Sequence, residues 1–157
     1  MINSKFTIVT FYQFKKIYDI LIIKNELTHF CKFNKIKGTI ILAAEGINGT
    51  VAGVSEGIKK FESHLLSIGF TNYTPKYSYS KFMPFFRLKV RNKKEIVTLR
   101  AKNVDPENIT GKKIKPEEWN NLISDKETIL IDVRNYFEVE MGTFKNSINP
   151  NTKSFTE

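Results

Sequence analysis

Cysteine and histidine are rare in this 157-residue sequence, which contains one Cys and two His. A single cysteine excludes an internal disulfide and is typical of proteins from reducing compartments. The two histidines, His29 and His64, each stand without a second ligand nearby in the sequence, so neither is expected to form a metal site. We therefore expect no bound metal and no bound cofactor.

Long apolar runs are missing as well. No run approaches the roughly 20 residues that a membrane-spanning helix needs, and the N-terminus lacks the apolar core and small-residue cleavage site of a signal peptide. Hydrophobic residues nevertheless make up 41% of the chain, which is enough for a folded core and is not typical of a disordered protein. These features predict a globular cytoplasmic protein without membrane contact.

Acidic residues are scarce in the first part of the chain. Residues 1–100 carry 17 Lys and Arg against 6 Asp and Glu, a net charge of +11, whereas residues 101–157 carry 8 against 10, a net charge of −2. This asymmetry favours a polyanionic partner for the first part, with nucleic acid as the leading candidate. A lysine-rich base composition is the alternative explanation, although it does not account for the acidic second part.

The hydrophobic periodicity of residues 1–100 predicts alternating strands and helices. Phe6–Phe14 is rich in β-branched and aromatic residues, as strands are. Lys15–Phe33 changes to helical spacing and places Cys31 on the apolar stripe, as a buried core residue. A second helix is expected to have Ser55 as its N-cap and to end at Gly69. Two further strands are expected at Tyr73–Lys81 and Phe85–Leu99.

The order strand, helix, hairpin, helix, strand is the βαββαβ plan of an α+β, ferredoxin-like domain. Acylphosphatases and many RNA-binding domains share this plan, so the fold class alone does not choose a function. An acylphosphatase reaction is not expected, because the segment after the first strand lacks an arginine-bearing phosphate loop.

The segment Lys37–Val54 is predicted to form a hairpin at the centre of this domain. Asn48-Gly49 tolerates positive φ at both central positions of a two-residue turn, so we expect the turn there, with Glu45 opposite Ala52. Two interpretations stay open. The segment is either a buried hairpin with an ordinary structural turn, or a substrate loop in which a carboxylate orients a ligand beside bare backbone amides. The loop residues would be Glu45, Gly46, Asn48 and Gly49.

Apolar and basic residues alternate strictly in Phe86–Arg91. One strand face is expected to carry Phe86, Leu88 and Val90 into the core, while the other displays cations. That outer face is either simply solvated or in contact with RNA, with aromatic rings stacking on bases. The candidate rings are Tyr77, Tyr79, Phe82 and Phe85. The candidate RNA-binding cations are Arg87, Lys89, Arg91, Lys93 and Lys94.

The composition changes after residue 100. We interpret residues 101–115 as a polar linker between a basic domain, residues 1–100, and a shorter segment, residues 116–157. About 40 residues with one good strand are too few to bury a core of their own. The second domain is therefore expected to be truncated.

Within this second segment, Pro116 suits the first position of a short helix. Thr128–Val133 is typical of a buried strand in a parallel sheet. Asp132 and Arg134 stand at the C-terminal end of that strand, and we expect them to form a structural ion pair rather than a catalytic site.

Five segments of the chain together carry a resemblance to one known family. They are Ala44–Gly49, Pro84–Arg91, Lys94–Leu99, Pro116–Trp119 and Ile131–Asn135. In order and spacing they resemble the bacterial rhodanese-domain tRNA uridine hydroxylases, which act on the wobble uridine. The resemblance implies an acylphosphatase-like domain followed by a rhodanese domain, with tRNA as substrate. It also implies conversion of uridine to 5-hydroxyuridine with molecular oxygen as co-substrate, at a cysteine of the rhodanese loop.

Two departures from the family pattern bear on activity. The family's cysteine follows a later strand, beyond Glu157, and Cys31 lies in the other domain. The segment that normally has the pattern Gly-His-Phe-x-Gly-Ala is Gly142–Ser147 here and lacks the second glycine. We therefore expect an N-terminal fragment with no catalytic residue and no hydroxylase activity. The alternatives are a non-catalytic tRNA- or RNA-binding module, and half of a split rhodanese-type enzyme that docks on a separately encoded C-terminal piece.

Overall fold

The computed structural model of the chain describes residues 5–98 and 111–152. The chain divides into two compact units, Met1–Val97 and Thr98–Glu157, and each unit is described by itself. The greater part of the predicted linker, residues 101–110, lies outside the described residues.

Within residues 5–98, the first unit contains five strands and two helices. In chain order they are β1 (Phe6–Phe14), α1 (Ile20–Phe33), β2 (Lys37–Ala43), β3 (Gly46–Gly53), α2 (Ser55–Ser67), β4 (Lys76–Ser80) and β5 (Leu88–Asn92). The strands form one sheet in the order β4-β1-β3-β2-β5, in which only the β2–β5 pair is parallel. The first six elements follow the βαββαβ plan, which confirms the predicted ferredoxin-like fold. Strand β5 extends that plan by a fifth strand.

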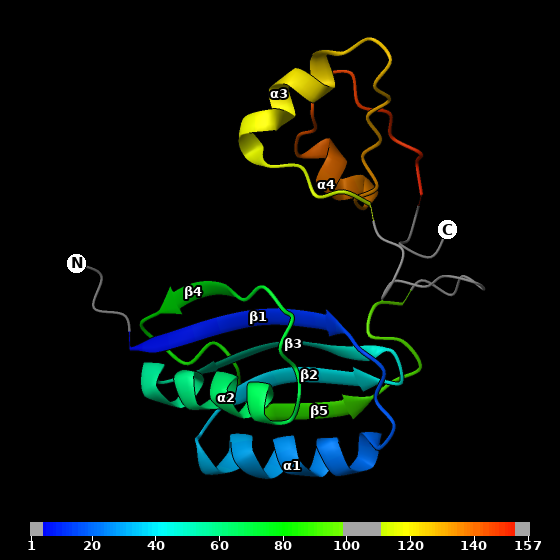
Figure 1. Ribbon diagram of the computed structural model, residues 1–157. Helices are drawn as coiled ribbons and strands as arrows, with labels where there is room; N and C mark the ends of the chain where they lie inside the picture. The colour runs from blue at the N-terminus through cyan, green and yellow to red at the C-terminus, as the bar shows by residue number, and fades with distance from the viewer. Residues whose placement is uncertain (1–4, 99–110, 153–157) are drawn as a thin grey trace. The chain divides into compact units, whose positions relative to one another are not determined.

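Both helices pack on the same face of the sheet (Figure 1). Because side chains alternate along a strand, every second strand residue points toward the helices. On β1, Val9 and Phe11 take this direction and are 0% and 1% exposed. Phe61 of α2 packs on Phe11 with ring centroids 5.5 Å apart, and Cys31 of α1 is fully buried, as predicted. We call the opposite side of the sheet the open face.

The first helix begins five residues later than predicted. The N–H groups of Lys15 and Ile17 donate to the carbonyls of Glu45 and Ala44, at 2.8 and 2.9 Å. These bonds hold the end of β1 against the β2–β3 turn, so the chain reaches helical geometry only at Ile20.

The second helix differs from the prediction at its start and agrees at its end. Val54 is the N-cap, and Ser55 is already the first helical residue. The Ser55 hydroxyl is 2.9 Å from the hydroxyl of Thr7 on β1, so this side chain serves the sheet rather than the helix end. Gly69 follows the C-cap with a φ of +92°, as a helix-ending glycine should.

The predicted turn at Asn48-Gly49 is wrong. Strand pairing places Ala43 opposite Gly46, so the two-residue turn is Ala44-Glu45, and the Asn-Gly dipeptide lies inside β3. Ala52 consequently pairs with Lys37 and not with Glu45. The observed turn lies four residues closer to the N-terminus than the predicted one.

The glycines of β3 have packing reasons. A Cβ on Gly46, whose φ is +153°, would lie 2.1 Å from the carbonyl oxygen of Gln13. A Cβ on Gly49 would lie 2.8 Å from the ring of Phe11 and 2.9 Å from the carbonyl oxygen of Thr39. At both positions a neighbouring strand comes too close for a side chain, so only glycine fits. The sequence alone does not show whether a glycine is there for this reason or for a turn.

The last strands are shorter than predicted. Strand β4 covers five residues of the expected Tyr73–Lys81, and β5 covers five of the expected Phe85–Leu99. Leu88 and Val90 pack against the core as predicted. Phe86 lies before β5 begins and is 100% exposed, so its predicted place in the core is wrong.

In the second unit, residues 111–152 contain α3 (Pro116–Ser124) and α4 (Tyr136–Glu140). Pro116 is the first residue of α3, as predicted. Thr128–Val133 is neither a strand nor buried: Ile131 alone makes a parallel bridge, to Ile148, and no residue between 111 and 152 is buried. A strand needs a neighbour along its whole length, and the described residues supply one only at a single position.

Candidate nucleic-acid interface

The open face carries every charged side chain of the five strands. The strands contain no Asp or Glu, and their four cations are Lys37, Lys76, Lys89 and Arg91. Each cation occupies a position alternate to the core residues; Lys89, for example, lies between the inward Leu88 and Val90. All four therefore point away from the helices.

The charges on this face have no carboxylate to offset them within the strands. In the described part of the chain, none of the four cations belongs to an ion pair. Lys89 and Arg91 stand on one strand only two residues apart, about 7 Å, and like charges at such spacing repel. A bound polyanion relieves that repulsion and gains from all four cations together.

Five cations were predicted from the sequence to contact RNA, and the structure places them at and around β5. Lys89 and Arg91 lie on the open face. Arg87 directly precedes the strand, is exposed, and accepts the Gly38 N–H with its carbonyl at 3.2 Å. Two further exposed lysines follow the strand, Lys93 and Lys94.

Sequence reasoning missed the other two open-face cations. Lys37 and Lys76 are the first residues of β2 and β4, and each is distant from β5 in sequence. The pairing register sets Lys76 opposite Thr10 and Lys37 opposite Ala52, and so shows on which face of the sheet they lie. Alternation along each strand could have suggested that face. Their presence on the same surface as the β5 cations follows only from the strand order.

Two of the four aromatic rings proposed for base stacking are misplaced. Tyr77 is paired with the core residue Val9 and faces the helices, where its hydroxyl donates to Glu62 of α2 at 2.5 Å. That bond is the main reason why the pKa of Tyr77 is raised to about 12. Tyr79 shares this face by alternation. Phe82 remains a candidate, since it lies after β4 and is 79% exposed.

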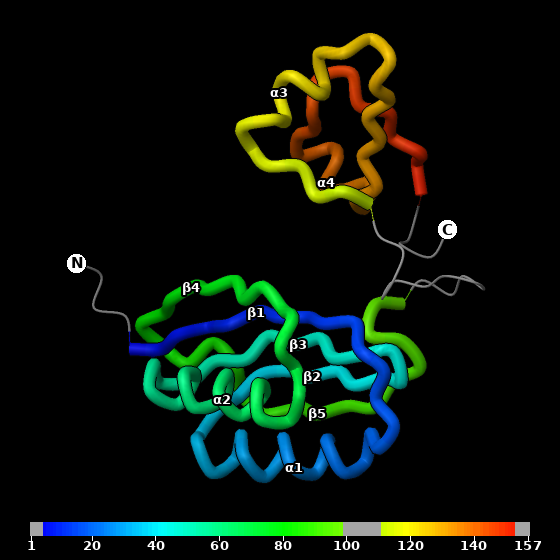
Figure 2. The backbone as a smooth tube through the Cα atoms, in the orientation of Figure 1, coloured from blue at the N-terminus to red at the C-terminus, as the bar shows by residue number. Residues whose placement is uncertain are grey.

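The proposed substrate loop forms a backbone clamp. The carboxylate of Glu45 accepts the N–H of Ile96 at 2.7 Å, and the side-chain amide of Asn48 donates to the carbonyl of the same residue at 3.0 Å. Ile96 is 2% exposed. Figure 2 shows the chain after β5 turning back beside the β2–β3 hairpin. Both side chains are thus occupied in fixing the chain's exit from the sheet.

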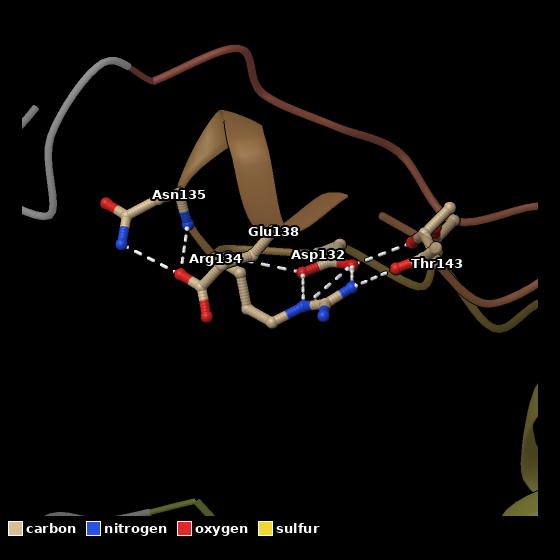
Figure 3. A network of polar contacts seen from close by, with 7 residues as sticks. Asp132, Arg134, Asn135, Glu138 and Thr143 are labelled. Atoms are coloured by element: carbon tan, nitrogen blue, oxygen red, sulfur yellow. Dashed lines mark hydrogen bonds and ion pairs between the residues drawn. The ribbon is translucent and has the colours of Figure 1, made fainter. Parts of the chain in front are cut away.

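Asp132 and Arg134 form the expected ion pair in the second unit (Figure 3). The guanidinium donates from Nε and Nη2 to the two carboxylate oxygens, at 2.9 and 2.7 Å. The hydroxyl of Thr143 also donates to this carboxylate, at 2.7 Å. These two partners, Arg134 first, lower the pKa of Asp132 below its usual range. Their role as a structural anchor stays a prediction.

The segment Gly142–Ser147 is tied to this pair. Arg134 donates to the carbonyl of Gly142 at 2.6 Å. Asn146, which stands where the family pattern has a glycine, has a φ of +65°. Asparagine is among the few non-glycine residues that tolerate this conformation, so the turn is kept at some cost in strain.

The single thiol is unsuited to nucleophilic chemistry. Cys31 is 0% exposed, and burial raises its pKa to about 12. A reactive cysteine needs a lowered pKa and access to substrate. Cys31 offers neither.

Residues 5–98 and 111–152 contain no group of three His, Cys, Asp or Glu side chains placed to hold a metal ion. None of their helices is long and apolar enough to cross a membrane.

Comparison with known proteins assigns the family. Residues 6–96, more than half of the chain, match the family of the UPF0176 acylphosphatase like domain. The chain belongs to this family. A relative named tRNA uridine(34) hydroxylase, from Acaryochloris marina, is 45% identical over 155 residues, covering 98% of this chain and 50% of the relative. A relative of the same name from Brucella anthropi is 43% identical over 158 residues, covering 100% and 52%.

The resemblance found in the sequence is thereby confirmed, and the chain spans about half the length of the curated relatives it matches. Among solved structures, an acylphosphatase from Coxiella burnetii is similar over 58% of this chain and 100% of its own. Its sequence identity is 9% and the TM-score is 0.42.

Proposed function

We propose that this chain is the tRNA-binding part of a tRNA uridine hydroxylase that acts in the cytoplasm on the wobble uridine. Two observations support the proposal: the family membership and the names of the relatives. The observation that carries the binding role is the open face, on which four cations stand without any carboxylate from the strands.

Binding and chemistry are divided in this proposal. The open face and its neighbours Arg87, Lys93 and Lys94 hold tRNA through its phosphates. The oxidation of uridine to 5-hydroxyuridine uses molecular oxygen as co-substrate and takes place at a rhodanese cysteine that the residues of this chain do not include. Cys31 does not replace it, because its thiol is buried and protonated.

The binding role is tested by measuring tRNA affinity against salt concentration. We expect the double variant K89Q/R91Q to bind tRNA more weakly and to lower the salt slope by about 1.8, from about 0.9 per lost phosphate contact. The matched control is K59Q/K60Q, which removes the same charge from exposed positions of α2. Equal losses of tRNA affinity in both variants would contradict a specific interface and would show that binding depends only on the net charge of the chain.

The absence of chemistry is tested with the 157-residue chain alone. After incubation with unmodified tRNA and oxygen, we expect mass spectrometry of the digested tRNA to show no 5-hydroxyuridine. The C31S variant should give the same result. Formation of 5-hydroxyuridine by the purified chain would overturn this part of the proposal.

A second candidate function is favoured by the second unit. Ile129, Ile131 and Val133 are 74%, 53% and 65% exposed, although their spacing is that of one strand face. We propose that a separately supplied rhodanese piece docks on them and pairs with Thr128–Val133 as neighbouring strands. Hydrogen exchange tests this: the amides of Ile129, Ile131 and Val133 should exchange fast in the free monomer. Strong protection there in the monomer would exclude the docking.

A further inference from the structure

One row of side chains crosses the whole open face. Pairing sets Lys76 of β4 opposite Thr10 of β1, Thr10 opposite Thr50 of β3, Thr50 opposite Thr39 of β2, and Thr39 opposite Lys89 of β5. Directly paired residues share a face, so these side chains form one line. We call this line the threonine row: Lys76, Thr10, Thr50, Thr39 and Lys89.

The row has an unusual distribution of polar groups. Its two ends are lysines on opposite edges of the sheet, and its centre consists of hydroxyls alone. The hydroxyls of Thr10 and Thr50 are 3.0 Å apart and exposed. Thr10 is exposed and the other two threonines are half-buried. With strands about 4.8 Å apart, the lysines are about 19 Å from each other.

These dimensions fit an extended polyanion better than a small ligand. A nucleic-acid strand rises about 3.4 Å per stacked nucleotide, so the row spans at most about six nucleotides. A hydroxyl both donates and accepts a hydrogen bond, and it therefore suits the phosphate oxygens and the ribose 2′-hydroxyl alike. No side chain in the row carries negative charge.

We propose that the threonine row is a track for the sugar–phosphate backbone of single-stranded RNA, which lies across the strands. Lys76 and Lys89 bind phosphates at the two ends, and the threonine hydroxyls contact phosphate oxygens and 2′-hydroxyl groups between them. This deepens the proposed function, on which it rests: the wobble uridine of tRNA lies in an unpaired loop, and RNA loops are the usual targets of single-strand recognition.

The track predicts discrimination between RNA and DNA. Phosphate contacts alone do not distinguish the two backbones, whereas a contact to the 2′-hydroxyl does. Removal of the hydroxyls should therefore weaken RNA binding more than DNA binding. Removal of a lysine should weaken both.

The test measures binding of a short oligouridylate and the matching oligodeoxyuridylate to the full chain. The variant is T10V/T39V/T50V, since valine keeps the shape and β-branching of threonine. We expect RNA affinity to fall about 5- to 25-fold more than DNA affinity, from one or two lost bonds to 2′-hydroxyl groups at roughly fivefold each. DNA loses only the bonds to its phosphates, and equal losses for RNA and DNA would overturn the 2′-hydroxyl contacts. The control is S63A, which removes an exposed hydroxyl from α2.

A second variant tests the direction of the track without relying on the folding of the triple variant. Lys76→Gln changes one exposed residue on the edge opposite β5. A strand that crosses the sheet predicts that K76Q lowers the salt slope for oligouridylate by about 0.7, as K89Q does. A loss in K89Q with none in K76Q would overturn the track and keep the basic interface. Unchanged binding in both would contradict the proposed function as well.

Discussion

The two units of this chain differ in what they bury. Unit Met1–Val97 contains a closed core of side chains from both helices and the sheet, many of them 0–2% exposed. In the second unit no residue between 111 and 152 is buried, and several apolar side chains are more than half exposed. The first unit therefore has a continuous buried core. The second unit has none among its described residues and is held by local contacts such as the Asp132–Arg134 ion pair.

The same contrast appears in charge. In the first unit, the open-face cations have no carboxylate among the strand residues, whereas α1 and α2 carry four lysines together with three glutamates. The second part of the chain is slightly acidic. A polyanion is therefore expected to bind the open face rather than the helices, where carboxylates accompany the lysines.

The largest expected difference concerns the core. Phe61→Ala removes a fully buried ring that packs on Phe11 and Phe30, and we expect the free energy of unfolding of the first unit to fall by about 3–5 kcal/mol. Denaturant unfolding followed by circular dichroism measures this loss.

The matched control for the core is Phe144→Ala in the second unit. Phe144 is 52% exposed and contacts Trp119, the only tryptophan of the chain, whose fluorescence therefore reports on the second unit alone. We expect the free energy of unfolding of the second unit to fall by less than about 1 kcal/mol. Similar losses of unfolding free energy for Phe61→Ala and Phe144→Ala would contradict the difference in burial between the two units.

A smaller effect is expected at the glycine inside β3. Gly49→Ala places a Cβ against the Phe11 ring and the Thr39 carbonyl, which should cost about 1–3 kcal/mol through overpacking. Gly111→Ala is the counterpart in the second unit, where a Cβ meets nothing within 4 Å. Thermal unfolding should show a lowered midpoint only for Gly49→Ala. An unchanged midpoint would mean that the strand adjusts freely.

The clamp at Ile96 gives the next prediction. Glu45→Ala leaves the buried Ile96 amide without its acceptor, at a cost of about 1–2 kcal/mol. Hydrogen exchange of that amide should accelerate, while Glu45→Gln, which keeps an acceptor oxygen, should protect it. Glu56→Ala, on an exposed site of α2, serves as control. Slow exchange in Glu45→Ala would show that the carboxylate has another role.

The smallest effect is a pH dependence in the second unit. The pKa of Asp132 is lowered in the folded state by Arg134 and Thr143. A lowered folded pKa stabilises above the unfolded value of about 3.9, and the stabilisation is lost as the pH falls below it. Trp119 fluorescence should therefore change below about pH 4 in the wild type. In Arg134→Gln that dependence should shrink, and an identical titration would contradict the ion pair as its cause.

The parts of the fold that follow from local periodicity were predictable. The β-branched and aromatic composition of Phe6–Phe14 predicts a strand, and the helical stripe around Cys31 predicts a helix with its buried side; the structure has both elements. The Asn48-Gly49 turn failed because packing against Phe11 demands the same residue type as a turn. Turn propensity is local, whereas this requirement comes from a neighbouring strand.

The candidate site was predictable only in part, for a related reason. The β5 cations Lys89 and Arg91 are visible as an alternation within one segment, but Lys37 and Lys76 join them only through strand order and register. The role of Glu45 likewise depends on where Ile96 passes, about 50 residues later. Thr128–Val133 shows the reverse case, a strand pattern without neighbours to pair with.

Salt-dependent tRNA binding by the wild type and by K37Q/K76Q/K89Q/R91Q tests the central claim most directly. We expect the quadruple variant to fold, to bind tRNA far more weakly, and to lose about 3.6 units of the slope of log affinity against log salt, at about 0.9 per lost phosphate contact. A variant with four lysines of the helix face changed, K24Q/K32Q/K59Q/K60Q, should keep most of that slope. Equal slopes for the wild type and the open-face variant would contradict the interface.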